Sequence, residues 1–261
     1  MTYTHGHGPA ALANHVTRTA QDSVAFVLPY LHRDSRVLDV GCGPGSITLD
    51  LAALIAGEGG AASQVIGVEN TPAPVEAAQQ LAHQRGIGAV FMTGDARALP
   101  FPDGTFDIVV AHQVLQHLGD PVAALREFAR VTAPGGVVAV RDADYDAMFF
   151  HPQPAGLLDW QRDYRRRARA NGGEPDAGRY LLQWARAAGF GAGQLTYSTT
   201  TWQYSSGAGA SWLADNWVRR TCDSDAVTAE ATDRICAGWR TWSEDAAAVF
   251  VMPHGELLIR V

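Results

Sequence analysis

Short apolar runs alternate with amphipathic helical patterns between residues 36 and 142. The apolar runs predict strands at Arg36–Val40, Gln64–Glu69, Ala89–Gly94, Phe106–His112 and Gly136–Asp142. The stretches between them carry helix start and stop signals, such as Asp120 before Pro121 and the terminal glycines Gly57 and Gly86. This alternation predicts an α/β fold with a doubly wound, mostly parallel sheet covered on both faces.

The pattern changes after Tyr145. Two helical stretches, 153–173 and 176–190, precede a strand rich in β-branched and aromatic residues at 193–204, and "HGELLIRV" at the end predicts an edge strand. Without repeats or a low-complexity linker, we expect one domain over residues 1–261. We divide it into an N-terminal helical arm (1–35), a cofactor-binding core (36–145) and a substrate-side segment (146–261).

The composition narrows the function classes. The chain has 261 residues, 47% of them hydrophobic and 18% charged, which is enough to bury a sizeable core. A net charge of -7 argues against nucleic acid as a partner and favours a small-molecule ligand. Three widely spaced cysteines, no secretory leader pattern and no long apolar run predict a cytoplasmic protein without a membrane segment. The oligomeric state stays open.

The stretch "VLDVGCGPGSITLDLA" places a glycine turn between a strand and a helix, where backbone can approach a ligand closely. A phosphate loop would need a lysine that is absent, and the nicotinamide fingerprint would need glycine at the position of Ser46. Glu69, followed by Asn70, ends the second strand and is suited to a ribose diol, which both NAD and S-adenosylmethionine present.

The stretch "TGDARALPFPDGTFDIVVAHQVLQHLGDPVAALREFARVTAPGG" resembles the class I S-adenosylmethionine-dependent methyltransferases, specifically their small-molecule, ubiquinone/menaquinone-type branch. The resemblance covers residues 36–145. It implies S-adenosylmethionine as cofactor and S-adenosylhomocysteine as product. It places Asp95 near the adenine amine, with Ala96 supplying a backbone N–H, and it places the first strand's end near the methionine part, which brings in Asp39, Gly41, Cys42 and Gly43.

The same resemblance implies a seven-stranded, Rossmann-like sheet with an antiparallel last strand. The final hairpin would pair "TYSTTTWQY" with "HGELLIRV", and residues 205–245 between them would form a helical cap inserted before the last strand. Ordinary members of the family have a shorter connection there, so the cap bears on the substrate class.

The N-terminal stretch "YTHGHG…HVTRTAQDS" resembles the arm of actinobacterial and fungal methyltransferases that include S-methylating enzymes of dithiol natural products. In those proteins the arm folds over the cofactor, which implies that Tyr3 lines the pocket and that Arg18 pairs with the methionyl carboxylate. His5 and His7 lack a third ligand nearby, so we expect no metal.

Methyl transfer from a sulfonium is an in-line displacement that needs a base only when the acceptor holds a proton. His112, at the end of the fourth strand, is a candidate base or a pocket-lining residue. Tyr145, Trp212 and Trp217 are candidates for the substrate pocket, whereas Arg165–Arg169 is read as a solvated helix face.

We therefore expect methyl transfer to a small molecule, with the thiol of a secondary metabolite ahead of other acceptors. Transfer to oxygen or carbon of a phenol or quinone-like substrate is the alternative. A nicotinamide-dependent oxidoreductase and a cofactor-binding protein without methyl transfer are the remaining alternatives.

Overall fold

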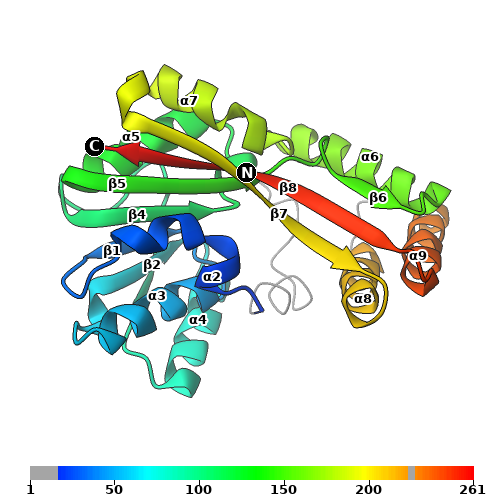
Figure 1. Cartoon of the computed structure of the whole chain (residues 1–261), viewed down its shortest axis with the longest axis horizontal. Helices are drawn as coiled ribbons and strands as arrows, with labels where there is room; N and C mark the ends of the chain where they lie inside the picture. Colours follow the sequence, from blue (N-terminus) through cyan, green and yellow to red (C-terminus); the bar gives the residue numbers. More distant parts are fainter. Residues whose placement is uncertain (1–16, 223–226) are drawn as a thin grey trace.

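The computed structural model describes residues 17–222 and 227–261. Its central sheet has the order β3-β2-β1-β4-β5-β8-β6, with β7 on the other edge of β8 (Figure 1). Strands β1 to β5 pair in parallel with one another, and β8 is antiparallel to β5, β6 and β7. The strands are β1 (Val37–Val40), β2 (Val65–Glu69), β3 (Val90–Thr93), β4 (Phe106–His112), β5 (Thr132–Ala143), β6 (Phe149–His151), β7 (Leu195–Ser205) and β8 (Val249–Arg260).

Helices cover both faces of the parallel half of this sheet (Figure 1). On one face α5 (Pro121–Val131) and α7 (Leu181–Ala188) contribute Phe128 and Leu181 to the core, because their apolar residues recur at helical spacing. On the other face lie α2 (Ala20–Ser23), α3 (Ser46–Gly57) and α4 (Pro72–Arg85). The predicted doubly wound, mostly parallel fold is confirmed.

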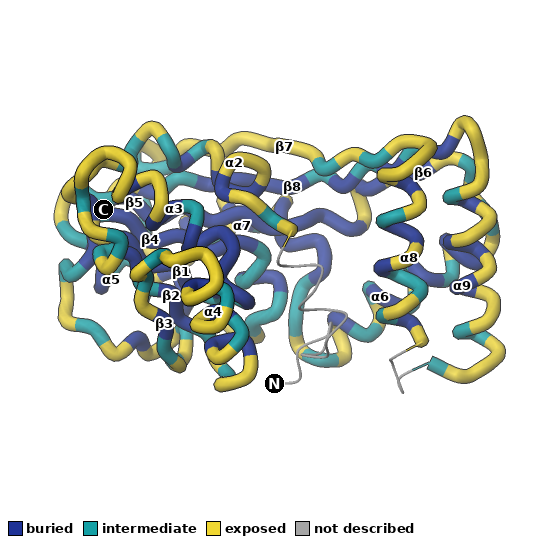
Figure 2. Tube along the Cα trace, turned by 90° about the horizontal axis from the view of Figure 1, so that it is seen from below, coloured by how far each residue is buried: buried dark blue, intermediate teal, exposed yellow. Residues whose placement is uncertain are grey.

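The antiparallel part departs from the expected pattern in three ways. Strand β8 begins at Val249, before the expected "HGELLIRV", and its first residues extend beyond β5. Phe149–His151 pairs with this projecting part as an eighth, short strand. The prediction that β8 is an edge strand was wrong, because β7 covers its outer side over the whole length. The exposed residues of β7 are visible in Figure 2.

The projecting half of β8 carries a separate helical layer, which we call the cap. It consists of α6 (Ala155–Ala170), α8 (Ala208–Cys222) and α9 (Ala229–Glu244), gathered at one end of the molecule in Figures 1 and 2. The insertion expected at 205–245 therefore supplies α8 and α9, while α6 comes from the segment after β6. Trp160, Trp239 and Trp242 are almost fully buried inside this layer.

The sequence predicted neither a membrane segment nor a metal site. Within 17–222 and 227–261, no helix is both long and apolar enough to cross a bilayer. The same ranges contain no group of three His, Cys, Asp or Glu side chains placed to hold a metal ion. His5, His7 and Tyr3 lie outside the described residues.

Helices α6 and α9 cross at a contact between two glycines. A Cβ on Gly156 would lie 2.0 Å from the backbone carbonyl oxygen of Arg234, and a Cβ on Gly238 would lie 2.7 Å from the Cα of Gly156. Backbone atoms cannot yield as the end of a flexible side chain can, so the crossing requires these small residues.

We expect Gly156→Ala to force α6 away from α9 and to lower the free energy of unfolding by about 1–3 kcal/mol, the usual cost of overpacking. Denaturant unfolding followed by tryptophan fluorescence measures the loss. Gly193→Ala is the matched control, because no heavy atom lies within 4 Å of the added Cβ. Equal stability of the two variants would show that the glycine contact does not determine this packing.

Candidate active site

The glycine turn after β1 is held by the neighbouring strand. The N–H groups of Gly41 and Cys42 both donate to the carbonyl of Val68, at 2.8 and 3.2 Å. Gly41 has a φ of +71°, and a Cβ there would lie 2.4 Å from Cγ2 of Val114. Conformation and space therefore both require glycine at this position.

The carboxylate of Glu69 closes the turn from the end of β2. Its Oε1 accepts from the N–H of Gly43 at 3.1 Å, and its Oε2 accepts from the N–H of Asn70 at 2.8 Å. Each carboxylate oxygen has a second lone pair, so this fixed group can still accept from a diol. The turn leads into α3 through Gly45, whose lack of a side chain leaves the helix without a side-chain cap. The arrangement fits a nucleoside-containing cofactor.

Asp39 and Cys42 lie underneath this turn and are buried. Asp39 Oδ2 accepts a 2.6 Å hydrogen bond from Thr48 Oγ1 and thereby ties β1 to α3. Burial raises the pKa of Asp39 to about 7, an effect that Thr48 opposes and the charge of Glu69 reinforces. Burial, with the nearby carboxylates, also raises the pKa of the Cys42 thiol, which argues against a thiolate there.

Asp95 lies just beyond β3, next to the end of β2. The N–H of Gly94 donates to the carbonyl of Glu69 at 2.8 Å, which joins the two strand ends. Both oxygens of Asp95 are paired with Arg97, at 3.0 Å to Nε and 2.8 Å to Nη2, and these hydrogen bonds lower the pKa of Asp95. Ala96 follows and packs against the core. The structure thus brings Glu69, Asn70, Asp95 and Ala96 to one edge of the sheet.

A chain of hydrogen bonds crosses the same edge at the end of β4. Arg18 Nη2 donates to Gln113 Oε1 at 3.0 Å, Gln113 Nε2 donates to His254 Nε2 at 2.9 Å, and His254 Nδ1 donates to the Met252 carbonyl at 3.0 Å. The carbonyl fixes the proton of His254 on Nδ1. Burial holds the pKa of His254 well below its usual value, with the charges of Arg141 and Arg18 acting in the same direction.

His112 is held by the buried guanidinium of Arg141, whose Nη1 lies 2.8 Å from His112 Nε2. Because a guanidinium only donates, Nε2 accepts and a neutral His112 carries its proton on Nδ1. Arg141 Nε also donates to Thr200 Oγ1 at 3.1 Å and to Glu256 Oε1 at 3.2 Å. A proton on His112 Nε2 would displace the Arg141 hydrogen bond and set two cations side by side.

A cavity of about 530 Å³ lies between the sheet edge, residues 17–22 and the cap. Three side chains that the sequence suggested for substrate, Tyr145, Trp212 and Trp217, line it, as does Arg18. The other lining residues are Thr17, Asp22, Gln113, Thr201, Trp202, Gln203, Tyr204, Gly209, Leu213, Arg220, Phe250 and Met252.

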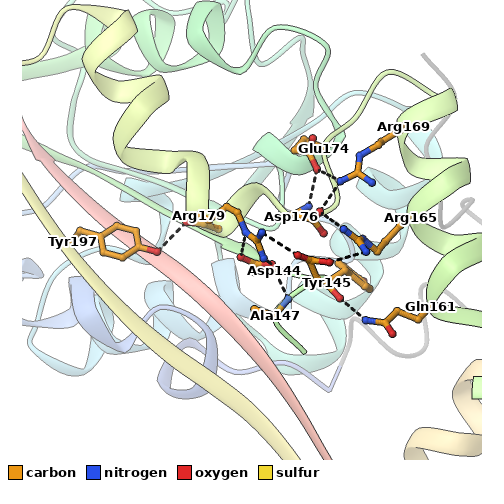
Figure 3. A network of polar contacts seen from close by, with 12 residues as sticks. Asp144, Tyr145, Ala147, Gln161, Arg165, Arg169, Glu174, Asp176, Arg179 and Tyr197 are labelled. Carbon is orange, nitrogen blue, oxygen red and sulfur yellow. Dashed lines mark hydrogen bonds and ion pairs between the residues drawn. The ribbon is translucent and has the colours of Figure 1, made fainter. Parts of the chain in front are cut away.

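Tyr145 is held in this wall by flanking ion pairs (Figure 3). Arg179 binds Asp144 through two 2.6 Å hydrogen bonds, and Arg165 lies 2.8 Å from Asp146. Arg165 also pairs with Asp176, which is 2% exposed and receives Arg169 as well. The prediction of a solvated face was therefore wrong for Arg165, whose side chain is 25% exposed, whereas Arg169 stays 45% exposed and pairs with Glu174 and Asp176 just after α6.

Several residues at the site were missed by sequence reasoning. Gln113 directly follows a candidate residue and has a φ of +57°, unusual outside glycine. Its place just after β4, at the ligand-binding edge of a parallel sheet, was a usable signal. Arg141 gave none, because its partners come from β7 and β8, whereas Arg220 lies one helical turn after the candidate residue Trp217.

Comparisons with known proteins agree with a site for a nucleoside-containing cofactor. A family model described as a methyltransferase domain matches residues 31–189. An uncharacterized methyltransferase of Schizosaccharomyces pombe is 33% identical, covering 100% of this chain and 96% of that protein. The 27-O-demethylrifamycin SV methyltransferase of Amycolatopsis mediterranei is 30% identical over 70% of each chain.

Solved structures show the same fold. The YcgJ protein of Bacillus subtilis gives a TM-score of 0.54 at 24% identity, covering 92% of this chain and 98% of that one. Geranyl diphosphate methyltransferase in complex with S-adenosylmethionine gives a TM-score of 0.54 at 17% identity, covering 97% of this chain and 90% of that one.

We expect Glu69→Gln to weaken the binding of S-adenosylhomocysteine roughly 10- to 100-fold, because a charged acceptor for a ribose diol is lost. The amide oxygen can still accept from Gly43, which keeps the hydrogen bond that closes the turn, while the hydrogen bond from Asn70 is lost because the amide nitrogen cannot accept. Isothermal titration measures the affinity, with the exposed Glu76→Gln on α4 as the control of equal charge change. Unchanged affinity in Glu69→Gln would remove Glu69 from the cofactor site.

Proposed function

The chain belongs to the S-adenosylmethionine-dependent methyltransferases that act on small molecules, and we propose that its acceptor is the thiol of an aromatic secondary metabolite. The observation that carries this proposal is the aromatic cavity that begins at Gln113, just after β4, and has guanidinium groups in its wall and, among the described residues, no imidazole. The family assignment excludes the alternative of a nicotinamide-dependent oxidoreductase.

The cofactor supplies an electrophilic methyl group, and this chain's residues bind and orient the two reactants. We assign Asp39, Gly41, Cys42 and Gly43 to the turn that receives the methionine part, with Glu69 and Asn70 at the ribose and Asp95 and Ala96 at the adenine. Arg18 stays assigned to the methionyl carboxylate, and its place in the cavity wall, bound to Gln113, supports a position near the reacting groups. Tyr3 belongs to the same proposal and lies outside the described residues.

The walls of the cavity suit a flat, apolar acceptor. Trp202, Trp212 and Tyr204 present ring surfaces, and Tyr204 stacks on Trp212 with centroids 5.7 Å apart and planes 21° from parallel. Rings fixed in this way offer large apolar area at little cost in side-chain entropy. Binding an aromatic molecule there removes water from the acceptor atom, which favours displacement at the methyl group.

The hydrogen bonds of the site favour an acceptor that ionises without an enzyme base. His112 and His254 both use Nε2 as an acceptor from a neighbouring donor. Asp22, the carboxylate among the described lining residues, uses Oδ1 to cap α2 by accepting from the N–H of Thr19 and the hydroxyl of Ser23. A thiol has a pKa of about 8.5 and is partly ionised near neutrality, whereas the pKa of a phenol is about 10.

A phenolic oxygen is the second candidate acceptor. The rifamycin relative bears a name that specifies a 27-O-demethyl substrate, so oxygen methylation occurs among proteins of similar sequence. The cavity admits a phenol as readily as a thiol of the same skeleton, and only the ease of ionisation separates the two.

We expect 2-naphthalenethiol to be methylated at least about tenfold faster than 2-naphthol at pH 7.5, because the larger thiolate fraction and sulfur's nucleophilicity both favour sulfur. Transfer of a tritiated methyl group from S-adenosylmethionine measures the rates, and a dithiol and a quinol extend the panel. Labelling of the naphthol or the quinol alone, at oxygen or at carbon, would overturn the thiol proposal. A panel without any labelled acceptor would exclude these classes altogether.

The same assay tests the role of His112. Loss of a general base lowers a rate by about 10²–10⁴-fold. Because Nε2 is bound by Arg141, we expect His112→Asn to lower the rate with the thiol by less than about tenfold and to leave the shape of the pH profile unchanged. A loss of more than about 100-fold, together with loss of one ionisation from the pH profile, would identify His112 as the base.

A further inference from the structure

The aromatic walls of the cavity already carry cations supplied by the protein. The guanidinium carbon of Arg220 lies 5.0 Å from the centroid of a Trp217 ring. Those of Arg18 and Arg141 lie 5.1 and 5.0 Å from a ring of Trp202. All three distances are within the range of a cation–π interaction. A cationic acceptor would therefore meet guanidinium groups at both of these tryptophans.

The support under Arg220 is rigid. Trp217 stacks on Trp239 with planes 8° from parallel and centroids 6.0 Å apart, and it meets Trp160 edge-on at 4.6 Å. Trp239 and Trp160 are buried in the cap. Arg220 also belongs to the last turn of α8, where the helix dipole favours a positive charge. Its guanidinium is thus positioned at the cavity wall before any ligand arrives.

The charge balance of the wall is positive among the described residues. Arg18 and Arg220 face one carboxylate, Asp22, which caps α2. Both cations also act on the phenol of Tyr145: burial raises its pKa, and the charges of Arg220 and Arg18 oppose that rise. Two positive groups from opposite sides of the cavity therefore influence the same ring. Such a wall favours an anion over a neutral molecule, and a neutral molecule over a cation.

We propose that Arg220 is a substrate-binding residue that recognises a carboxylate on the aromatic acceptor. This rests on the proposed function, because it takes the cavity as the acceptor site. A planar carboxylate matches the fork of a guanidinium with two parallel hydrogen bonds. Arg18 is assigned to the methionyl carboxylate of the cofactor, so the anchoring of the acceptor falls to Arg220 of the cap. An acceptor held by Arg220 then directs its other end to Gln113, at the carboxyl edge of β4.

Three probes of one shape test this without any methyl transfer. They are 2-naphthoate, its neutral amide and 2-naphthylmethylammonium, and none of them is required to react. Quenching of tryptophan fluorescence and isothermal titration give their affinities for the full chain saturated with S-adenosylhomocysteine. The variants are Arg220→Met and Arg220→Lys. Arg219→Met is the control, because its neighbouring, exposed side chain is outside the cavity wall and the charge change is equal.

We expect the native chain and Arg219→Met to bind naphthoate at least roughly tenfold more tightly than the amide, with the ammonium probe weakest. Arg220→Met is expected to bind naphthoate and amide about equally, and Arg220→Lys to keep part of the preference because its charge remains. Equal binding of acid and amide by the native chain overturns the proposal. So does absence of naphthoate binding, or an equal loss in Arg219→Met.

These results are separate from those of the proposed function. A preference for naphthoate that depends on Arg220, combined with no labelling of thiols, would leave the carboxylate site in place and refute the thiol acceptor. Labelled thiols combined with no such preference would do the reverse.

Discussion

Burying the guanidinium of Arg141 inside the sheet requires partners from several strands at once. Burial lowers its pKa to about 10, against the raising effect of Glu256, so the cation needs every compensating contact. Glu256 from β8 and Thr200 from β7 receive Nε, and His112 at the end of β4 receives Nη1. Trp202 lies within cation–π distance. This interaction joins four strands at the carboxyl edge and sets both the histidine tautomer and one wall of the cavity.

The second constraint is the length of β8. Its last residues complete the sheet beside β5, and its first residues project beyond that strand. The projecting part would expose an apolar strand to water without the layer formed by α6, α8 and α9. In the proposed function, the chain combines a cofactor half, built from parallel strands and glycine geometry, with an acceptor half built from aromatic packing. Changes in the cap can alter the acceptor while leaving the cofactor turn in place.

The cofactor half was largely accessible from the sequence because its signals are local. Glycines directly after an apolar strand predict the turn, and the position of Glu69 at the end of the next strand predicts that its carboxylate lies beside that turn. Helices α8 and α9 of the cap were placed correctly between the last two strands, but β6 and the inner position of β8 depend on how far β8 extends beyond β5. Arg141 and Arg220 could not be found, because a single arginine in a strand or helix has no local mark of burial. The partners of Arg141 are distant in the chain, and Arg220, although it contacts Trp217 three residues earlier, lines the cavity only through the packing of the cap.

A crystal structure with S-adenosylhomocysteine tests most directly the claim that the turn and the cavity form one site. We predict the ribose at Glu69, the adenine beside Asp95 and the thioether sulfur opening into the aromatic cavity near Gln113. A cofactor bound inside the cap cavity, or at the turn with its sulfur directed away from that cavity, would contradict the account.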